Sequence, residues 1–172
     1  IGCNENEVLI CSTGVIGVPI PMTNLIEALP NLVDRLDHNN LNDASEAILT
    51  TDLVQKKIVM ETVIDGKNIC IAGFAKGSGM IYPNMATMLA FLTCDAGIDK
   101  DSWDQIIKNA VKVSFNTITV DGETSTNDTF LAINSGDKIH KKNLPIIQEG
   151  VNLVCQYLAK SIARDGEGAN CL

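Results

Sequence analysis

The sequence predicts an α+β fold, in which helices and antiparallel strands form layers around one core. Two β-rich stretches flank Asp65-Gly66, a strong signal for a two-residue hairpin turn. A long helical pattern covers residues 144–163, and strands and helices do not alternate in the regular βαβ order of a doubly wound sheet. The chain has 172 residues, 45% hydrophobic and 20% charged, which suits a single domain, residues 1–172, with a buried core.

The N-terminal third is expected to hold one strand and several short helices. Residues 7–12 alternate weakly between apolar and polar side chains and predict a buried strand. Pro30 is expected to divide the apolar helical pattern around it into two pieces, because proline removes a backbone donor. A further helix over residues 44–49 would be capped by Asn42 or Asp43.

Four strands are expected in the rest of the chain. Residues 55–64 and 67–74 are the two arms of the hairpin. Residues 88–94 form a short apolar run that indicates a central strand, and residues 129–134 indicate another strand before a Ser-Gly turn.

Two amphipathic helices complete the prediction. The first would be capped by Asp101 or Ser102. Its apolar face consists of Trp103, Ile106, Ile107, Ala110 and Val113. The second, residues 144–163, presents its apolar side chains at helical spacing. They are Ile147, Val151, Val154, Cys155, Leu158 and Ile162.

Charge and composition exclude several classes of function. The net charge of −8 and the lack of a basic cluster argue against nucleic-acid or anionic-membrane partners, and no apolar run reaches membrane-spanning length. The six cysteines form no Cys-x-x-Cys pair and predict free thiols in the cytoplasm, although an even number leaves disulfides open. The two histidines, His38 and His140, lie in unrelated segments, so no metal site is expected.

The most informative segment surrounds Thr87. Thr87 follows Ala86, after a Gly-rich and Pro-containing approach and before an apolar run. A threonine in such a place can attack the carbonyl before it and release a new chain that starts with threonine. The new residue would carry a nucleophilic hydroxyl and a basic α-amino group together. The alternative is a β-branched residue that only opens a buried strand, a common role of threonine.

Five motifs resemble those of the ornithine acetyltransferase family, the bifunctional glutamate N-acetyltransferases of arginine biosynthesis. Residues 76–81 with 83–89 are similar to the family's autocleavage segment. With the other four motifs, it makes five in family order, spread from residue 11 to residue 169. They are Cys11–Gly17, Thr50–Asp52, Ser114–Thr129 and Asp165–Ala169.

The resemblance implies a fold and a processing event. The fold would be the α-β-β-α sandwich of the self-processing N-terminal-nucleophile-like type. The chain would be the central fragment of a longer protein, cleaved between Ala86 and Thr87 into an α chain ending at residue 86 and a β chain over residues 87–172.

The resemblance also implies a reaction and its residues. Thr87 would carry an acetyl group from N²-acetylornithine to glutamate, acting as nucleophile and, after cleavage, as base. Thr13 and Gly14 would form the oxyanion hole. Three residues would bind the amino-acid part of the substrates, with Thr87 beside them: Thr50, Lys76 and Glu167. Each of these residues also has an ordinary alternative. Thr13 and Gly14 could form a plain turn after a strand, and Thr50 could only end a helix. Lys76 could be a solvated lysine, and Glu167 could belong to a polar loop.

No metal or tightly bound cofactor is implied, and acetyl-CoA remains open as a co-substrate. The partners would be the small-molecule substrates, with the processed chains forming an αβ heterodimer that assembles into a heterotetramer. Two other functions stay open: a self-processing aminopeptidase or amidase of similar fold, and a non-catalytic α+β module. The polar residues 116–129 match the family but receive no individual catalytic task.

Overall fold

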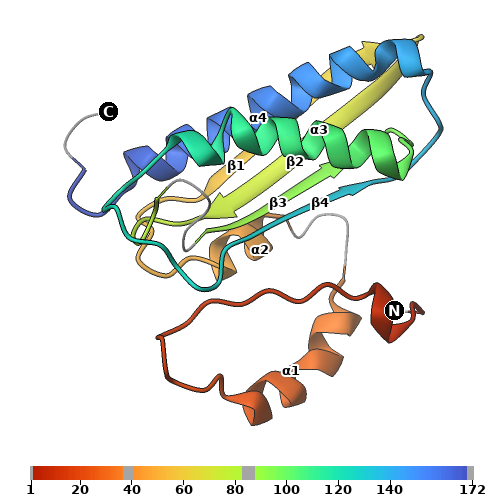
Figure 1. Ribbon diagram of the computed structural model, residues 1–172. Coiled ribbons are helices and arrows are strands. Elements are labelled where there is room, and N and C mark those ends of the chain that lie inside the picture. Colours follow the sequence, from red (N-terminus) through yellow and green to blue (C-terminus); the bar gives the residue numbers. More distant parts are fainter. Residues whose placement is uncertain (1, 37–40, 83–87, 170–172) are drawn as a thin grey trace.

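A four-stranded sheet with two helices on one face forms the body of the molecule (Figure 1). The computed structural model describes residues 2–36, 41–82 and 88–169. The spatial order of the strands equals their order in the chain. The strands are β1 (Lys56–Ile64), β2 (Lys67–Lys76), β3 (Leu89–Cys94) and β4 (Thr129–Asn134). The predicted α+β class is thereby confirmed.

The predicted hairpin joins β1 and β2. Asp65 and Gly66 both have positive φ, 49° and 78°, as a two-residue turn of the primed type requires, and Ile64 pairs with Lys67 on either side of it. β3 is central, antiparallel to β2 and parallel to β4. A parallel pair needs a crossover connection, which α3 (Lys100–Lys112) provides.

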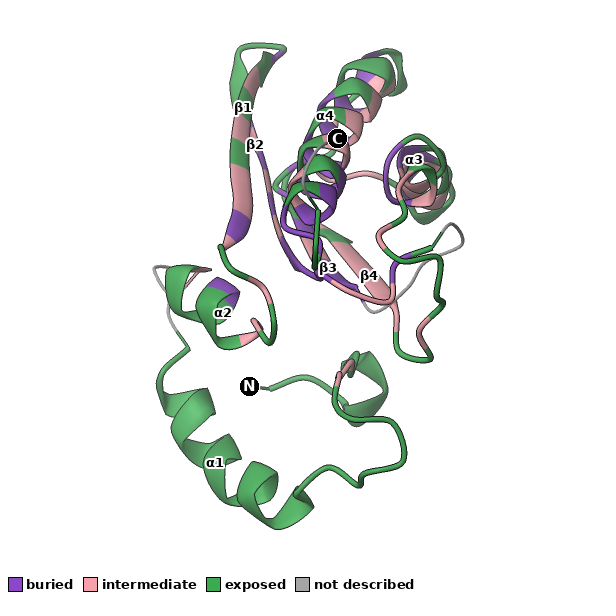
Figure 2. Ribbon diagram, turned by 90° about the vertical axis from the view of Figure 1, so that its left-hand side faces the viewer, coloured by how far each residue is buried: buried purple, intermediate pink, exposed green. Residues whose placement is uncertain are grey.

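Helix α4 (Leu144–Arg164) packs against β1 and β2 and confirms the predicted helix. Its six predicted apolar side chains are all buried. The helix lies close to β2 at Gly73, where an added Cβ would meet Val154 and Leu158 at 3.0 and 3.1 Å. Figure 2 shows buried residues on α4, on α3 and on the strands beneath them. This packing fixes the height of α4 above the sheet.

Helix α3 begins earlier than predicted. Its N-cap is Asp99, which accepts the Ser102 backbone N–H at 3.0 Å, so the predicted caps Asp101 and Ser102 both lie inside the helix. An N-cap residue must itself have an extended backbone, and Asp99, two residues before Asp101 and three before Ser102, has this conformation. Trp103, like Ile106 and Ala110, is buried as expected, whereas the C-terminal Val113 is exposed.

The N-terminal segment departs most from the sequence prediction. The expected strand over residues 7–12 is absent, and only a short 3₁₀ helix, η1 (Glu5–Glu7), precedes an extended stretch. Ile10 is 88% exposed. No strand among the described residues lies beside this stretch, so its backbone lacks the ladder partners that a strand needs.

The following helices differ in their boundaries. α1 (Met22–Asp34) is one continuous helix that includes Pro30, so the predicted division there is wrong. Figure 2 shows α1 exposed along its length, and solvent can therefore satisfy the carbonyl that proline leaves unpaired. α2 (Leu41–Ala47) starts before and ends before the predicted helix over residues 44–49.

The face of the sheet opposite α3 and α4 is only partly covered. Phe74 and Phe91 stack there with ring centroids 4.8 Å apart, and Val59, Val63 and Ile133 are more than half exposed. Along the described part of the chain, no helix combines the length and the apolar character needed to cross a membrane.

Candidate active site

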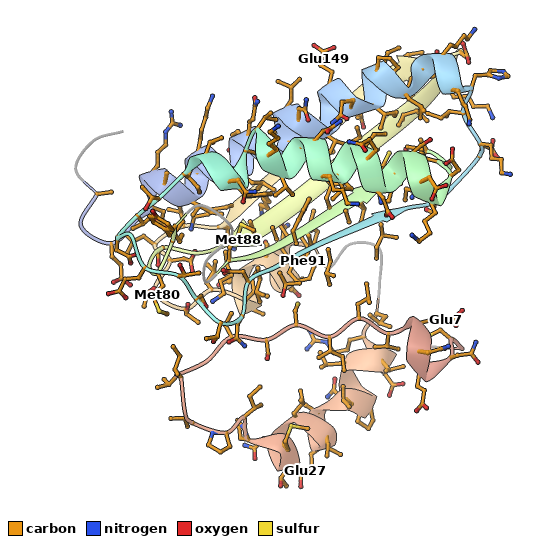
Figure 3. All side chains as sticks on the ribbon, in the orientation of Figure 1. Glu7, Glu27, Met80, Met88, Phe91 and Glu149 are labelled. Carbon is orange, nitrogen blue, oxygen red and sulfur yellow. The ribbon has the colours of Figure 1, made fainter. Side chains whose placement is uncertain are left out.

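A cavity of about 460 Å³ lies at the end of the sheet where β2 stops and the other three strands begin. Its walls come from loops that are distant in sequence. They include all five predicted site residues that the structure describes: Thr13, Gly14, Thr50, Lys76 and Glu167. Figure 3 shows Met80, another wall residue, at this end of the molecule. The predicted nucleophile Thr87 and the cleavage partner Ala86 lie outside the described residues.

Lys76 is the last residue of β2, and its side chain is buried rather than solvated. The residue is 1% exposed, and its Nζ donates a hydrogen bond to Thr50 Oγ1 at 3.2 Å. Burial lowers the pKa of Lys76, an effect that the charge of Asp52 opposes and that of Lys56 reinforces. The cavity therefore holds a partly desolvated ammonium group, which favours an anionic ligand group beside it.

A buried ion cluster, absent from the sequence prediction, supports this lysine. Lys56 Nζ lies 2.6 Å from Asp52 Oδ1 and 2.5 Å from Asp165 Oδ2. The side chains of Lys56 and Asp52 are completely buried, and that of Asp165 is 5% exposed. One lysine thereby joins the loop before β1 to the loop after α4, and the separation of 109 residues hides the pair from any local pattern.

The two carboxylates of the cluster also hold backbone groups of the cavity wall. Asp52 Oδ1 accepts the Gly77 N–H at 2.7 Å, and Asp165 Oδ2 accepts the Leu53 N–H at 3.0 Å. Burial alone would raise the pKa of Asp52, but hydrogen bonds from Lys56 and Gly77 and the lysine charge hold it below its ordinary value. Asp52 is therefore an ionised acceptor that orders the residue after Lys76.

Glu167 reaches the cavity from the loop that follows α4. Its backbone N–H donates to the Ser78 carbonyl at 2.7 Å, and its carboxyl carbon lies 3.5 Å from the point where a side chain on Gly79 would begin. The hydroxyl of Ser78 is in turn 2.6 Å from that of Thr51. The Gly77–Gly79 stretch thus contacts the Thr51–Asp52 loop on one side and Glu167 on the other.

Thr13 and Gly14 belong to the extended N-terminal stretch rather than to a turn after a strand. Thr13 is half-buried and Gly14 is exposed, and both line the cavity. The Asn127 side chain donates to the Ser12 carbonyl at 3.1 Å and ties this stretch to the loop before β4. A hydroxyl and a backbone N–H side by side are donors of the kind that can stabilise an oxyanion.

The loop before β4 holds the other wall of the cavity. Asp121 accepts the backbone N–H groups of Met80 and Ile81, the latter at 3.0 Å, and the Val120 N–H donates to the Ile81 carbonyl at 2.7 Å. Met80 has a positive φ of 52°, which a non-glycine residue adopts only when held. Burial alone would raise the pKa of Asp121, but hydrogen bonds from Met80, Glu123 and Ile81 lower it.

Comparison with known proteins adds an independent observation. A sequence model of the ArgJ family matches residues 1–172. The arginine biosynthesis bifunctional protein ArgJ of Prochlorococcus marinus subsp. pastoris is 69% identical over 172 residues, 100% of this chain and 43% of the relative. The protein of the same name in Prochlorococcus marinus (strain SARG) is 58% identical, over 98% of this chain and 41% of its own length. This chain thus spans less than half of these relatives.

Proposed function

This chain belongs to the ArgJ family, and we propose that the full-length protein transfers an acetyl group from N²-acetylornithine to glutamate in arginine biosynthesis. The observation that carries the proposal is the single cavity into which Thr13, Gly14, Thr50, Lys76 and Glu167 converge. Its volume of about 460 Å³ suits a small-molecule ligand. The name of the relatives supports the pathway.

The charges of the cavity complement an α-amino acid. The Glu167 carboxylate binds the substrate α-ammonium, and the Lys76 ammonium binds a carboxylate or acyl oxygen, with Thr50 fixing the lysine through its hydroxyl. Both the donor N²-acetylornithine and the acceptor glutamate share the α-amino-acid frame. One pocket can therefore serve both halves of a ping-pong reaction.

The reaction proceeds through an ester on Thr87. The α-amino group freed by cleavage takes the proton of the Thr87 hydroxyl, whose oxygen attacks the acetyl carbonyl. The Thr13 hydroxyl and the Gly14 N–H stabilise the tetrahedral oxyanion, and the proton is returned to the departing ornithine amine. Glutamate then attacks the acetyl ester in the reverse sequence, so no metal or bound cofactor takes part, and acetyl-CoA is an additional donor to be tested.

The remaining proposals concern the whole protein. The partly exposed sheet face with Val59, Val63 and Ile133 packs against a second sheet, which completes an α-β-β-α sandwich. The two processed chains form a heterodimer that assembles into a heterotetramer. The enzyme is cytoplasmic, which the unpaired buried thiols of Cys94 and Cys155 support.

Two measurements on the full-length protein test this function. Mass spectrometry and N-terminal sequencing should find two chains, the second starting at Thr87, and Thr87→Ala should leave one intact chain. With labelled N²-acetylornithine, label should appear in N-acetylglutamate and depend on glutamate. An uncleaved wild type that matches Thr87→Ala in every assay would identify a non-catalytic module, and glutamate-independent release of acetate would identify a hydrolase.

A further inference from the structure

The loop before β4 contacts the residue that directly follows the proposed nucleophile. Asp128 Oδ1 accepts the Met88 N–H at 2.6 Å, and the Thr129 N–H donates to the Met88 carbonyl at 2.9 Å. Both backbone groups of Met88 are thereby held by two consecutive residues, at the point where β3 and β4 begin their parallel pairing. The start of β3 cannot shift along β4 without breaking both bonds.

The Met88 N–H is part of the peptide bond that joins residue 88 to Thr87. Asp128 therefore binds the first described backbone group after the proposed nucleophile. Covalent geometry also keeps the nitrogen of any residue within about 4 Å of the next nitrogen. Because Asp128 Oδ1 is 2.6 Å from the Met88 nitrogen, bond geometry alone limits its distance from the nitrogen that cleavage would free to about 7 Å.

Asp128 has an unused acceptor. Its Oδ2 is buried and has no hydrogen-bond partner among the described residues. Burial raises the pKa of Asp128, and the Met88 N–H partly offsets this effect. Lys76 is the strand partner of Leu89, and the cavity that it lines also holds the carboxylates of Asp121, Glu123 and Glu167. A buried oxygen without a partner is costly unless it has a use.

We propose that Asp128 is a positioning residue for the nucleophile: it fixes the peptide after Thr87 and, through its negative charge, stabilises the ammonium that forms when the new α-amino group takes the proton of the Thr87 hydroxyl. This inference rests on the proposed function and gives a role to the polar loop before β4. The amide of Asp128→Asn keeps an acceptor for the Met88 N–H but lacks the charge, whereas Asp128→Ala lacks both. The two variants thus separate the role of the hydrogen bond from the role of the charge.

The test uses the full-length protein and two readouts. Autocleavage, followed by mass spectrometry, should be near normal in Asp128→Asn and slower by about tenfold or more in Asp128→Ala, because only alanine loses the hydrogen bond. In the processed enzyme, the acid limb of kcat/KM against pH should move down by about one pH unit in Asp128→Asn, since a nearby anion favours the protonated amine. KM at the pH optimum should change little. Asp128→Glu should keep the wild-type limb.

The control is Asp137→Asn, which removes the same charge from an exposed residue paired with Lys67. Its cleavage and pH profile should equal those of the wild type. An Asp128→Asn profile that superimposes on the wild type would overturn the charge role, and normal cleavage in Asp128→Ala would overturn the fixing role. If none of the Asp128 variants folds while the wild type cleaves and transfers, the residue is structural and the inference is wrong. A wild type that neither cleaves nor transfers removes the proposed function instead.

Discussion

Replacing Lys56 by methionine should destabilise the protein and loosen the cavity at the same time. The substitution keeps most of the side-chain volume but leaves Asp52 and Asp165 buried without their cation. Each carboxylate must then stay charged without compensation, take up a proton or move towards water. The first response leaves a buried charge without a partner, and the other two weaken the hydrogen bonds that these carboxylates accept from Gly77 and Leu53.

The magnitude follows from the geometry of the cluster. The two acceptor oxygens lie 2.6 and 2.5 Å from one nitrogen, so they are at most about 5 Å apart. At an effective dielectric constant of about 20, two like charges at that distance repel by roughly 3 kcal/mol. Removing one partner of a buried ion pair typically costs about 3–5 kcal/mol. We therefore expect Lys56→Met to lower the free energy of unfolding by about 3–5 kcal/mol.

Urea denaturation of the full-length protein measures the loss, and amide hydrogen exchange localises it. Exchange at Gly77 and Leu53 should accelerate more than exchange within α4. The matched control is Lys57→Met on the next residue of β1, whose ammonium contacts the side chains of Asn42 and Gln55 rather than carboxylates. Its unfolding free energy should change by less than about 1 kcal/mol.

A second variant decides whether charge is the cause. Adding Asp52→Asn and Asp165→Asn to Lys56→Met neutralises the whole cluster, and it should recover part of the lost stability because no buried charge remains uncompensated. An unfolding free energy of Lys56→Met within about 1 kcal/mol of the wild type would refute the reasoning. So would a triple variant less stable than Lys56→Met alone.

Two further predictions concern acid and backbone conformation. The pKa of Asp52 is lowered in the folded state, so its contribution to stability is present above the unfolded pKa, near ~3.9, and is lost as the pH falls through the folded value. Asp52→Asn should therefore flatten the fall of the unfolding free energy below about pH 4, as followed by urea denaturation across the acid range. Gly136→Ala should cost more than about 2 kcal/mol, because φ is +104° and the new Cβ would lie 2.1 Å from the Asp95 carbonyl oxygen. Gly122→Ala is the control, with φ of +75° but open space, and should cost about 1 kcal/mol in the same denaturation assay.

Local patterns were sufficient to predict the sheet and the helices that cover it. The hairpin depends on two adjacent residues whose positive φ angles suit its turn, and α4 carries a regular apolar face from Ile147 to Ile162. In each case the signal comes from residues that are near one another in the sequence. The expected strand over residues 7–12 failed because a strand also needs a partner, and its pattern does not specify one.

The sequence predicted only those site residues that lie in the family motifs. Lys76 and Glu167 line one cavity as the family resemblance implies, but their roles and that of Thr87 stay predictions. The burial of Lys76 and the cluster around Lys56 were missed, since both depend on contacts between residues far apart in the chain. A charged residue near the start of a β-rich stretch, such as Lys56, looks like an ordinary surface residue until its partners are known.

Aspartates that accept backbone N–H groups connect the loops of the cavity. Among the described residues, the acceptors and donors pair as follows: Asp52 with Gly77, Asp165 with Leu53, Asp121 with Met80 and Ile81, and Asp128 with Met88. Irregular loops bury little apolar surface, and charge-assisted hydrogen bonds can replace that missing packing. These aspartates supply part of the net negative charge of the chain, and they use it to hold backbone N–H groups. In the proposed function, the buried Lys76 offsets these charges: without it, the carboxylates of the cavity walls would repel a substrate carboxylate.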